Sequence, residues 1–192
     1  DDVIKMGRTQ MQDAVPIRLG QEFHAYSSAI KRDINRIEKA SDELKVVNMG
    51  ASAIGTGINV DIDYFENVVP YINEVINLDL KQAEDLVDGT QNLDSFVVIS
   101  SALKTCAVNL SKMSNDLRLM SSGPRTGFGE INLPPKQNGS SIMPGKINPV
   151  IPEVMSQVSF NIIGNDMTIT MAAEAGQLEL NAFEPVIFYN LY

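Results

Sequence analysis

The sequence predicts an all-α fold built from long helices. Three stretches of the 192-residue chain place apolar side chains three or four residues apart, a spacing that puts them on one face of a helix. Glycine and proline gather in the connections, and no convincing pair of strands with alternating apolar side chains is present. These observations predict a bundle of long helices.

The first predicted long helix runs through apolar positions from Leu19 to Val47, with polar side chains such as Arg32 and Glu38 on its other face. The second runs from Phe96 to Met120 and alternates spacings of three and four residues without a break. Such regularity predicts a long helix that packs nearly parallel or antiparallel to others.

The third predicted long helix covers about 149–175. Between Glu153 and Glu174 its only charged residue is Asp166, so most of its circumference must be covered by protein. One chain of this length has difficulty enclosing three such helices. We therefore expect an elongated bundle that completes its core against other subunits or against a missing part of the chain.

The remaining segments are a shorter helix and two connections. The shorter helix is expected at about 63–77, with Asp61 or Asp63 as its N-terminal cap. Residues 48–59 form a loop of small residues after the first long helix. Residues 121–149 form the longest stretch without helical spacing, and a loop of that length in a helical protein is usually functional or disordered.

Composition excludes several classes of protein. The net charge is −9 and the pI is about 4.6, which argues against an electrostatic nucleic-acid binder or a basic membrane-surface protein. A single cysteine excludes an intramolecular disulfide. We see no secretory leader and no membrane-spanning stretch, so a cytoplasmic location is expected. Because the chain starts without Met, we expect it to be an internal piece of a longer protein.

The long loop carries the best candidates for chemistry. Ser140, Ser141 and Lys146 lie in a glycine-rich segment whose backbone N–H groups could form an anion-binding site, with Lys146 adding positive charge. A solvated flexible linker is the alternative interpretation. Cys106 is in register with an apolar helix face and is expected in the core, and His24 is expected to face solvent.

Five motifs along the chain resemble those of the aspartase/fumarase superfamily. The most specific is the eleven-residue segment 139–149, GSSIMPGKINP. The others are GRTQ at 7–10 followed by QDAVP at 12–16, GTGIN at 55–59, SSGPR at 121–125 and GND at 164–166. The resemblance covers essentially the whole chain, in the order and with the spacing of that superfamily.

The resemblance implies a fold and an assembly. Residues 1–192 would be the central helical-bundle domain of a larger enzyme whose N-terminal domain and C-terminal small domain are absent, with 121–149 as a mobile catalytic loop. Four subunits would form a homotetramer around a twenty-helix core. Each active site would be shared between three subunits, so the chain alone would be inactive.

Two features place the chain nearer the aspartate ammonia-lyase branch than the class II fumarase branch. Gln10 follows Gly-Arg-Thr where fumarases usually carry His. The stretch MAAEAGQL at 171–178, followed by Asn181 and the pair Glu184-Pro185, also resembles the ammonia-lyases. Fumarase, and a non-catalytic structural relative such as the lens crystallins of this superfamily, remain the alternatives.

The resemblance also implies a reaction, the reversible deamination of L-aspartate to fumarate and ammonia. Ser140 would remove the Cβ proton, giving an enediolate, and Lys146 and Asn148 would hold a substrate carboxylate with help from Ser141. Thr9, with Gln10 beside it, would bind substrate from another subunit's segment. No cofactor is implied, although some relatives are activated by a divalent cation.

Overall fold

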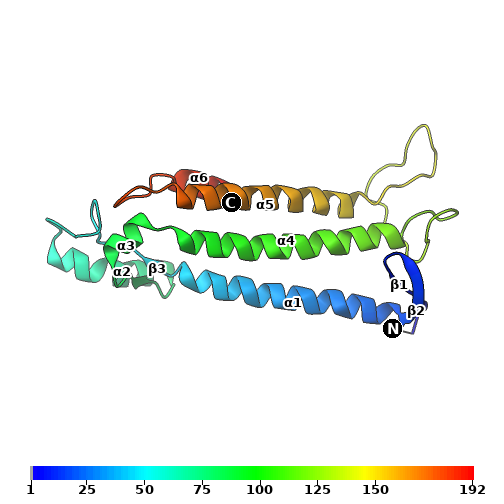
Figure 1. Ribbon diagram of the computed structural model, residues 1–192, viewed down its shortest axis with the longest axis horizontal. Coiled ribbons are helices and arrows are strands. Elements are labelled where there is room, and N and C mark those ends of the chain that lie inside the picture. Colours follow the sequence, from blue (N-terminus) through cyan, green and yellow to red (C-terminus); the bar gives the residue numbers. More distant parts are fainter. Residues whose placement is uncertain (1) are drawn as a thin grey trace. The chain divides into compact units, whose positions relative to one another are not determined.

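The computed structural model describes residues 2–192, and more than half of them are helical (Figure 1). In chain order the elements are β1 (Ile4–Thr9), β2 (Gln12–Arg18), α1 (Leu19–Glu43), β3 (Val46–Val47), α2 (Ile62–Ile76), β4 (Lys81–Gln82), α3 (Leu86–Gln91), α4 (Asp94–Met120), α5 (Val150–Glu174) and α6 (Glu184–Leu191). The prediction of a long-helix fold is confirmed by α1, α4 and α5. The first of these ends at Glu43, and Val47 belongs to β3 instead.

The chain forms two compact units. Unit 1 consists of the residues up to Ile34 and of Thr105–Ile162, whereas unit 2 consists of Asn35–Lys104 and Ile163–Tyr192. Each of the three long helices contributes one stretch to each unit. Among the described residues, no helix is long and apolar enough to cross a membrane.

Unit 1 contains a β-hairpin that the sequence analysis did not predict. Strands β1 and β2 pair antiparallel from Ile4 opposite Arg18 to Thr9 opposite Gln12. Between them Gln10 and Met11 both take the left-handed backbone conformation, with φ of 52° and 63°. The strands escaped recognition because most of their side chains are exposed or half-buried, so no alternating apolar face marks them.

Polar contacts join the helical stretches of unit 1. The Tyr26 hydroxyl of α1 donates a hydrogen bond of 2.9 Å to the Asp116 carboxylate of α4. Asp33, only 1% exposed, accepts hydrogen bonds of 2.8 and 3.0 Å from the Asn109 amide. The other buried side chains of the α4 and α5 stretches are mostly small: Ala107, Ser111, Ser114, Ser156 and Ser159.

Unit 2 has the larger apolar core. One cluster joins Leu93, Ile169, Ala172 and Ile187, the last of which is fully buried. Asp166, the only charged residue between Glu153 and Glu174 of α5, is buried here as well. It accepts a hydrogen bond of 2.8 Å from Ser100 and forms a 2.5 Å ion pair with Lys104, both on α4. An acidic residue is therefore accommodated inside a helix that is otherwise nearly free of charge.

The predicted short helix and its cap are confirmed in unit 2. Helix α2 starts after Asp61, whose carboxylate accepts hydrogen bonds from the backbone N–H groups of Asp63 and Tyr64. In the preceding loop Gly55 has a φ of +91°, and a Cβ atom there would lie 2.3 Å from the Cα of Val87. Only glycine fits at that position, which explains why the GTGIN motif needs it.

Candidate active site

Ser140 lies at the tip of the long loop, in a geometry that favours the deprotonated form of its hydroxyl group. No helix or strand lies between 121 and 149, as predicted. The Oγ atom of Ser140 accepts hydrogen bonds from the backbone N–H groups of Ile142 and Met143, each at 3.2 Å. Its own N–H donates to the carbonyl oxygen of Lys146 at 3.3 Å. Donors aimed at a hydroxyl oxygen stabilise its deprotonated form, so this arrangement suits a base.

Lys146 and Asn148 line a cavity of about 570 Å³ in unit 1, between the end of α4 and the start of α5. Arg118 and Glu153 also line it and form an ion pair of 3.6 Å. The first backbone N–H groups of α5 add partial positive charge beside Lys146, since α5 begins only two residues after Asn148. This cavity is therefore suited to a carboxylate.

The other predicted binding residues lie on the hairpin. Thr9 ends β1 and Gln10 starts the turn, and both are exposed. Gln10 lines a separate cavity of about 400 Å³ together with Lys5, Arg8 and Glu22. Left-handed backbone at a residue other than Gly, Asn or Asp is strained, and such strain is concentrated at functional sites.

Charged side chains from β1, α1 and the long loop form a cluster next to the hairpin. The Lys5 ammonium lies 3.0 Å from the Glu22 carboxylate and 3.1 Å from the Glu130 carboxylate. Burial opposes ionisation of Glu130, but the hydrogen bonds and positive charges of Arg8 and Lys5 outweigh it and hold the pKa of Glu130 below its usual value. The same carboxylates raise the pKa of Lys5 against the opposing effect of burial.

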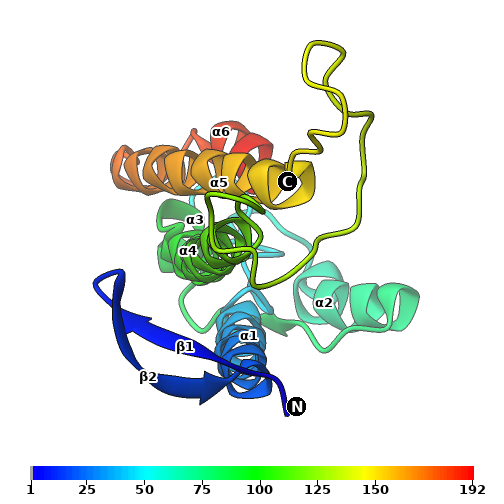
Figure 2. The ribbon, with the colours of Figure 1, turned by 90° about the vertical axis from the view of Figure 1, so that its right-hand side faces the viewer.

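Within one chain the structure does not bring all the predicted residues together. Figure 2 shows the hairpin turn on one side of the helix ends of unit 1 and the tip of the long loop on the other. Lys146 and Asn148 share a cavity, whereas Gln10 belongs to a different one. Ser141 is exposed on the loop. The chain thus offers two partial sites, one on the hairpin and one on the loop.

Sequence reasoning missed four charged residues beside these partial sites. Arg118 lies in the last turn of α4 and Glu153 in the first turn of α5, where opposite charges suit the helix dipoles on either side of the loop. That pattern could have identified them. Arg8 and Glu130 are paired across 122 residues, and no local spacing indicates such a contact.

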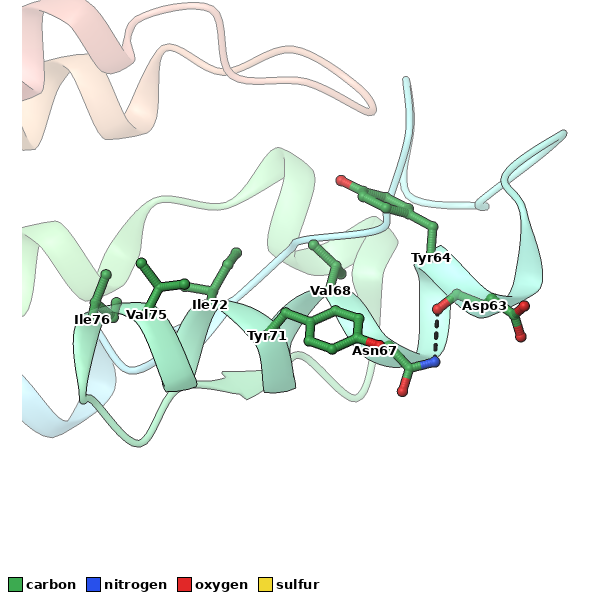
Figure 3. A pocket seen from close by; sticks show the side chains of 8 residues that line it. All are labelled: Asp63, Tyr64, Asn67, Val68, Tyr71, Ile72, Val75 and Ile76. Atoms are coloured by element: carbon green, nitrogen blue, oxygen red, sulfur yellow. Dashed lines mark hydrogen bonds between the residues drawn. The ribbon is translucent and has the colours of Figure 1, made fainter.

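The remaining candidates are structural or carry no chemistry. His24 is exposed, as predicted, and Cys106 is half-buried on α4. A further cavity, of about 740 Å³, runs along α2 in unit 2, where Val68, Ile72, Val75 and Ile76 project from the same side of the helix (Figure 3). Its lining is apolar or aromatic apart from Asp63 and Asn67. It contains none of the predicted site residues.

Comparison with known proteins supports the resemblance. A family model described as a lyase matches residues 1–164. The chain belongs to this lyase family. It is 58% identical to the aspartate ammonia-lyase of Bacillus subtilis over 191 residues, which are 100% of this chain and 40% of that protein. It is 55% identical to the Escherichia coli K12 aspartate ammonia-lyase over 186 residues, 97% of this chain and 39% of that one.

Solved structures of this lyase family have the same fold. A Brucella melitensis protein described as fumarate lyase:delta crystallin, bound to cobalt, superposes with a TM-score of 0.94 at 53% identity, over 98% of this chain and 41% of that one. A class II fumarase from Schistosoma mansoni gives a TM-score of 0.91 at 37% identity, over 98% of this chain and 43% of that one. The chain therefore spans about 40% of the length of the curated relatives it matches.

Proposed function

We propose that this chain is the central domain of an aspartate ammonia-lyase, which converts L-aspartate reversibly to fumarate and ammonia. The observation that carries the proposal is the pair of backbone donors on Ser140 Oγ, within a segment that matches the superfamily's most specific motif. The 58% identity to an aspartate ammonia-lyase, against 37% to a class II fumarase, supports the choice of substrate. Gln10, where fumarases usually carry His, supports the same choice.

The reaction requires removal of a weakly acidic proton from the Cβ of aspartate. The electrons left on that carbon spread into the adjacent carboxylate, giving an enediolate with two negative charges, and loss of ammonia then forms the double bond. Ser140 is the proposed base, because the N–H groups of Ile142 and Met143 stabilise its oxygen when it is charged. Lys146 adds a positive charge from the same loop.

The remaining residues are proposed to bind the substrate carboxylates. Lys146 and Asn148 face a cavity at the positive end of α5, with Ser141 contributing from the loop. Thr9 and Gln10 would act from the hairpin of another subunit, since the two partial sites lie apart within one chain. Exposed apolar side chains on α5, among them Ile151, Val154, Phe160, Met167 and Met171, support the proposed homotetramer. A cytoplasmic location is part of the same proposal.

The 121–149 loop is proposed to be the mobile catalytic part of the domain. The chain spans about 40% of the length of its curated relatives, so the remaining substrate contacts would come from segments outside it. The 192-residue chain alone should then be inactive, and lyase activity in the purified chain would contradict this part of the proposal. The proposed reaction needs no cofactor. The described residues contain no group of three or more His, Cys, Asp or Glu side chains placed to hold an activating cation.

Two alternatives lead to different assay results. A fumarase would release fumarate from L-malate instead of L-aspartate. A structural relative would bind the substrate without turning it over. The similar Brucella melitensis protein is described as fumarate lyase:delta crystallin, which is the reason for testing this alternative. The ultraviolet absorbance of fumarate, followed in the full-length enzyme with each substrate in turn, distinguishes all three. Turnover of malate alone, or of neither substrate, would overturn the proposal.

A further inference from the structure

The long loop has an attached part and an exposed part. In the attached part, residues 121–131, the N–H groups of Gly129 and Glu130 donate to the carbonyl oxygens of Ser122 and Met120, both at 2.8 Å. The N–H of Phe128 also donates to Ser122 Oγ at 3.0 Å. In the exposed part, residues 132–147, nearly every residue is exposed. The first part is therefore fastened to the end of α4.

A cluster of four charged side chains, Lys5, Arg8, Glu22 and Glu130, fastens the attached part to the hairpin as well. Glu130 accepts a 2.7 Å hydrogen bond from Arg8 Nη1 and lies 3.1 Å from Lys5 Nζ. Lys5 in turn lies 3.0 Å from Glu22 of α1. The side chains of Lys5 and Glu130 are only 10% and 15% exposed, so solvent screens this pair weakly.

A stacking contact beside the cluster joins the same two segments. The Arg8 guanidinium lies 4.3 Å from the centre of the Phe128 ring, which belongs to the attached part of the loop. Glu130 is the only acidic residue among 121–149, which also contain Arg125, Lys136 and Lys146. The sole negative charge of the loop is thus directed at the strand that ends in Thr9.

We infer that Glu130 is a positioning residue that holds the Thr9–Gln10 turn and the attached part of the loop as one rigid body. Arg8 precedes Thr9 directly, so its bond to Glu130 fixes the backbone from which Thr9 and Gln10 project. Movement of the loop is then confined to residues 132–147, which carry Ser140. This inference rests on the proposed function for its catalytic consequence, but not for the contact itself.

The contact is tested by hydrogen exchange in the full-length enzyme. In Glu130→Gln, exchange of residues 122–131 and 4–18 should rise roughly tenfold, because charge-assisted hydrogen bonds are lost. Exchange of 163–174, in unit 2, should stay unchanged. Glu130→Asp, which keeps the charge, should change exchange less than Glu130→Gln. The control Glu38→Gln removes an equal charge from an exposed position of α1 and should alter none of these segments.

Two exchange results would overturn the inference. Unchanged exchange in the hairpin of Glu130→Gln would show that Glu130 does not hold it. An equal rise throughout the chain, including 163–174, would show that Glu130 serves general stability.

Steady-state kinetics of the full-length enzyme test the positioning role. Glu130→Gln should raise KM for aspartate about tenfold and lower kcat less, because the cluster holds the substrate-binding turn and not the loop tip with Ser140. Increased exchange with an unchanged KM in an active enzyme would overturn the positioning role. Wild-type enzyme inactive towards aspartate would instead defeat the proposed function, and the exchange result would still decide whether the cluster exists.

Discussion

Replacing Asp166 by Asn should destabilise the protein markedly, although Asp166 is far from the predicted site residues in the sequence. Its side chain is 7% exposed and faces Lys104 Nζ at 2.5 Å, whereas the Lys104 side chain is 38% exposed. An amide in its place retains an acceptor for the Ser100 hydroxyl but loses the charge that balances Lys104.

The magnitude follows from that unequal burial. Breaking a fully buried ion pair from one side costs about 3–5 kcal/mol. Because the Lys104 side chain is partly exposed and can still reach water, we expect a loss of about 2 kcal/mol in the free energy of unfolding. For a chain of this size that corresponds to a fall in Tm of roughly 4–8 °C.

Urea unfolding followed by far-ultraviolet circular dichroism measures this loss, and the chain offers a matched control. Asp42→Asn removes the same charge from an ion pair with Lys45 in which the two side chains are 67% and 46% exposed, so it should cost far less than Asp166→Asn. A cost of Asp166→Asn no greater than that of Asp42→Asn would refute the argument from burial.

Three further predictions follow from the site and the core. Ser140→Ala should abolish lyase turnover in the full-length enzyme and leave the circular dichroism spectrum unchanged, and near-normal turnover would remove Ser140 from the mechanism. Ile187→Ala, at a fully buried position, should cost about 2–5 kcal/mol in urea unfolding; a cost below about 1 kcal/mol would contradict the packing described for unit 2. The pKa of Glu130 is lowered in the folded state, so its contribution to stability is present above the unfolded value of about 4.3 and is lost as the pH falls through the folded value. Urea unfolding at about pH 5 and about pH 3 should therefore show a larger loss in the wild type than in Glu130→Gln, and equal losses would contradict the ion pairing of Glu130.

The long helices could be predicted because burial follows the helical repeat. Phe96 to Met120 alternates spacings of three and four, and α4 spans Asp94–Met120. Asp61 was also predictable, since an acidic residue before a helix satisfies free N–H groups locally. In each case the signal and the structure it specifies lie within a few residues of each other.

The hairpin could not be predicted because its signals are weak or unusual. Its turn uses Gln10 and Met11 at positive φ, where glycine or asparagine usually marks a hairpin. Its strands lack an apolar face. The pairing of Arg8 with Glu130 depends on the way the chain folds back, which no spacing in the sequence encodes.

At the candidate site, the sequence motifs identified the candidate residues, and the structure shows which groups surround them. The sequence predicts a loop for the segment that contains Ser140, and in the structure two backbone N–H groups of that loop donate hydrogen bonds to Ser140 Oγ. Arg118 and Glu153 line the cavity beside Lys146, a placement that depends on how the ends of α4 and α5 meet in the fold. The roles assigned to all six site residues stay predictions: Thr9, Gln10, Ser140, Ser141, Lys146 and Asn148.

The serine-rich interior of unit 1 has a consequence for how the protein unfolds. All six predicted site residues belong to unit 1, yet among its described residues the buried apolar side chains are Ala107, Met120 and Pro152. Little apolar surface therefore opposes local opening there, whereas Ile169 and Ile187 stabilise unit 2. In limited proteolysis under mild denaturant, the first cuts should fall within unit 1. Activity would then be lost before the whole protein unfolds. Any surface that covers Ile151 and Val154 would protect both the activity and the folded state.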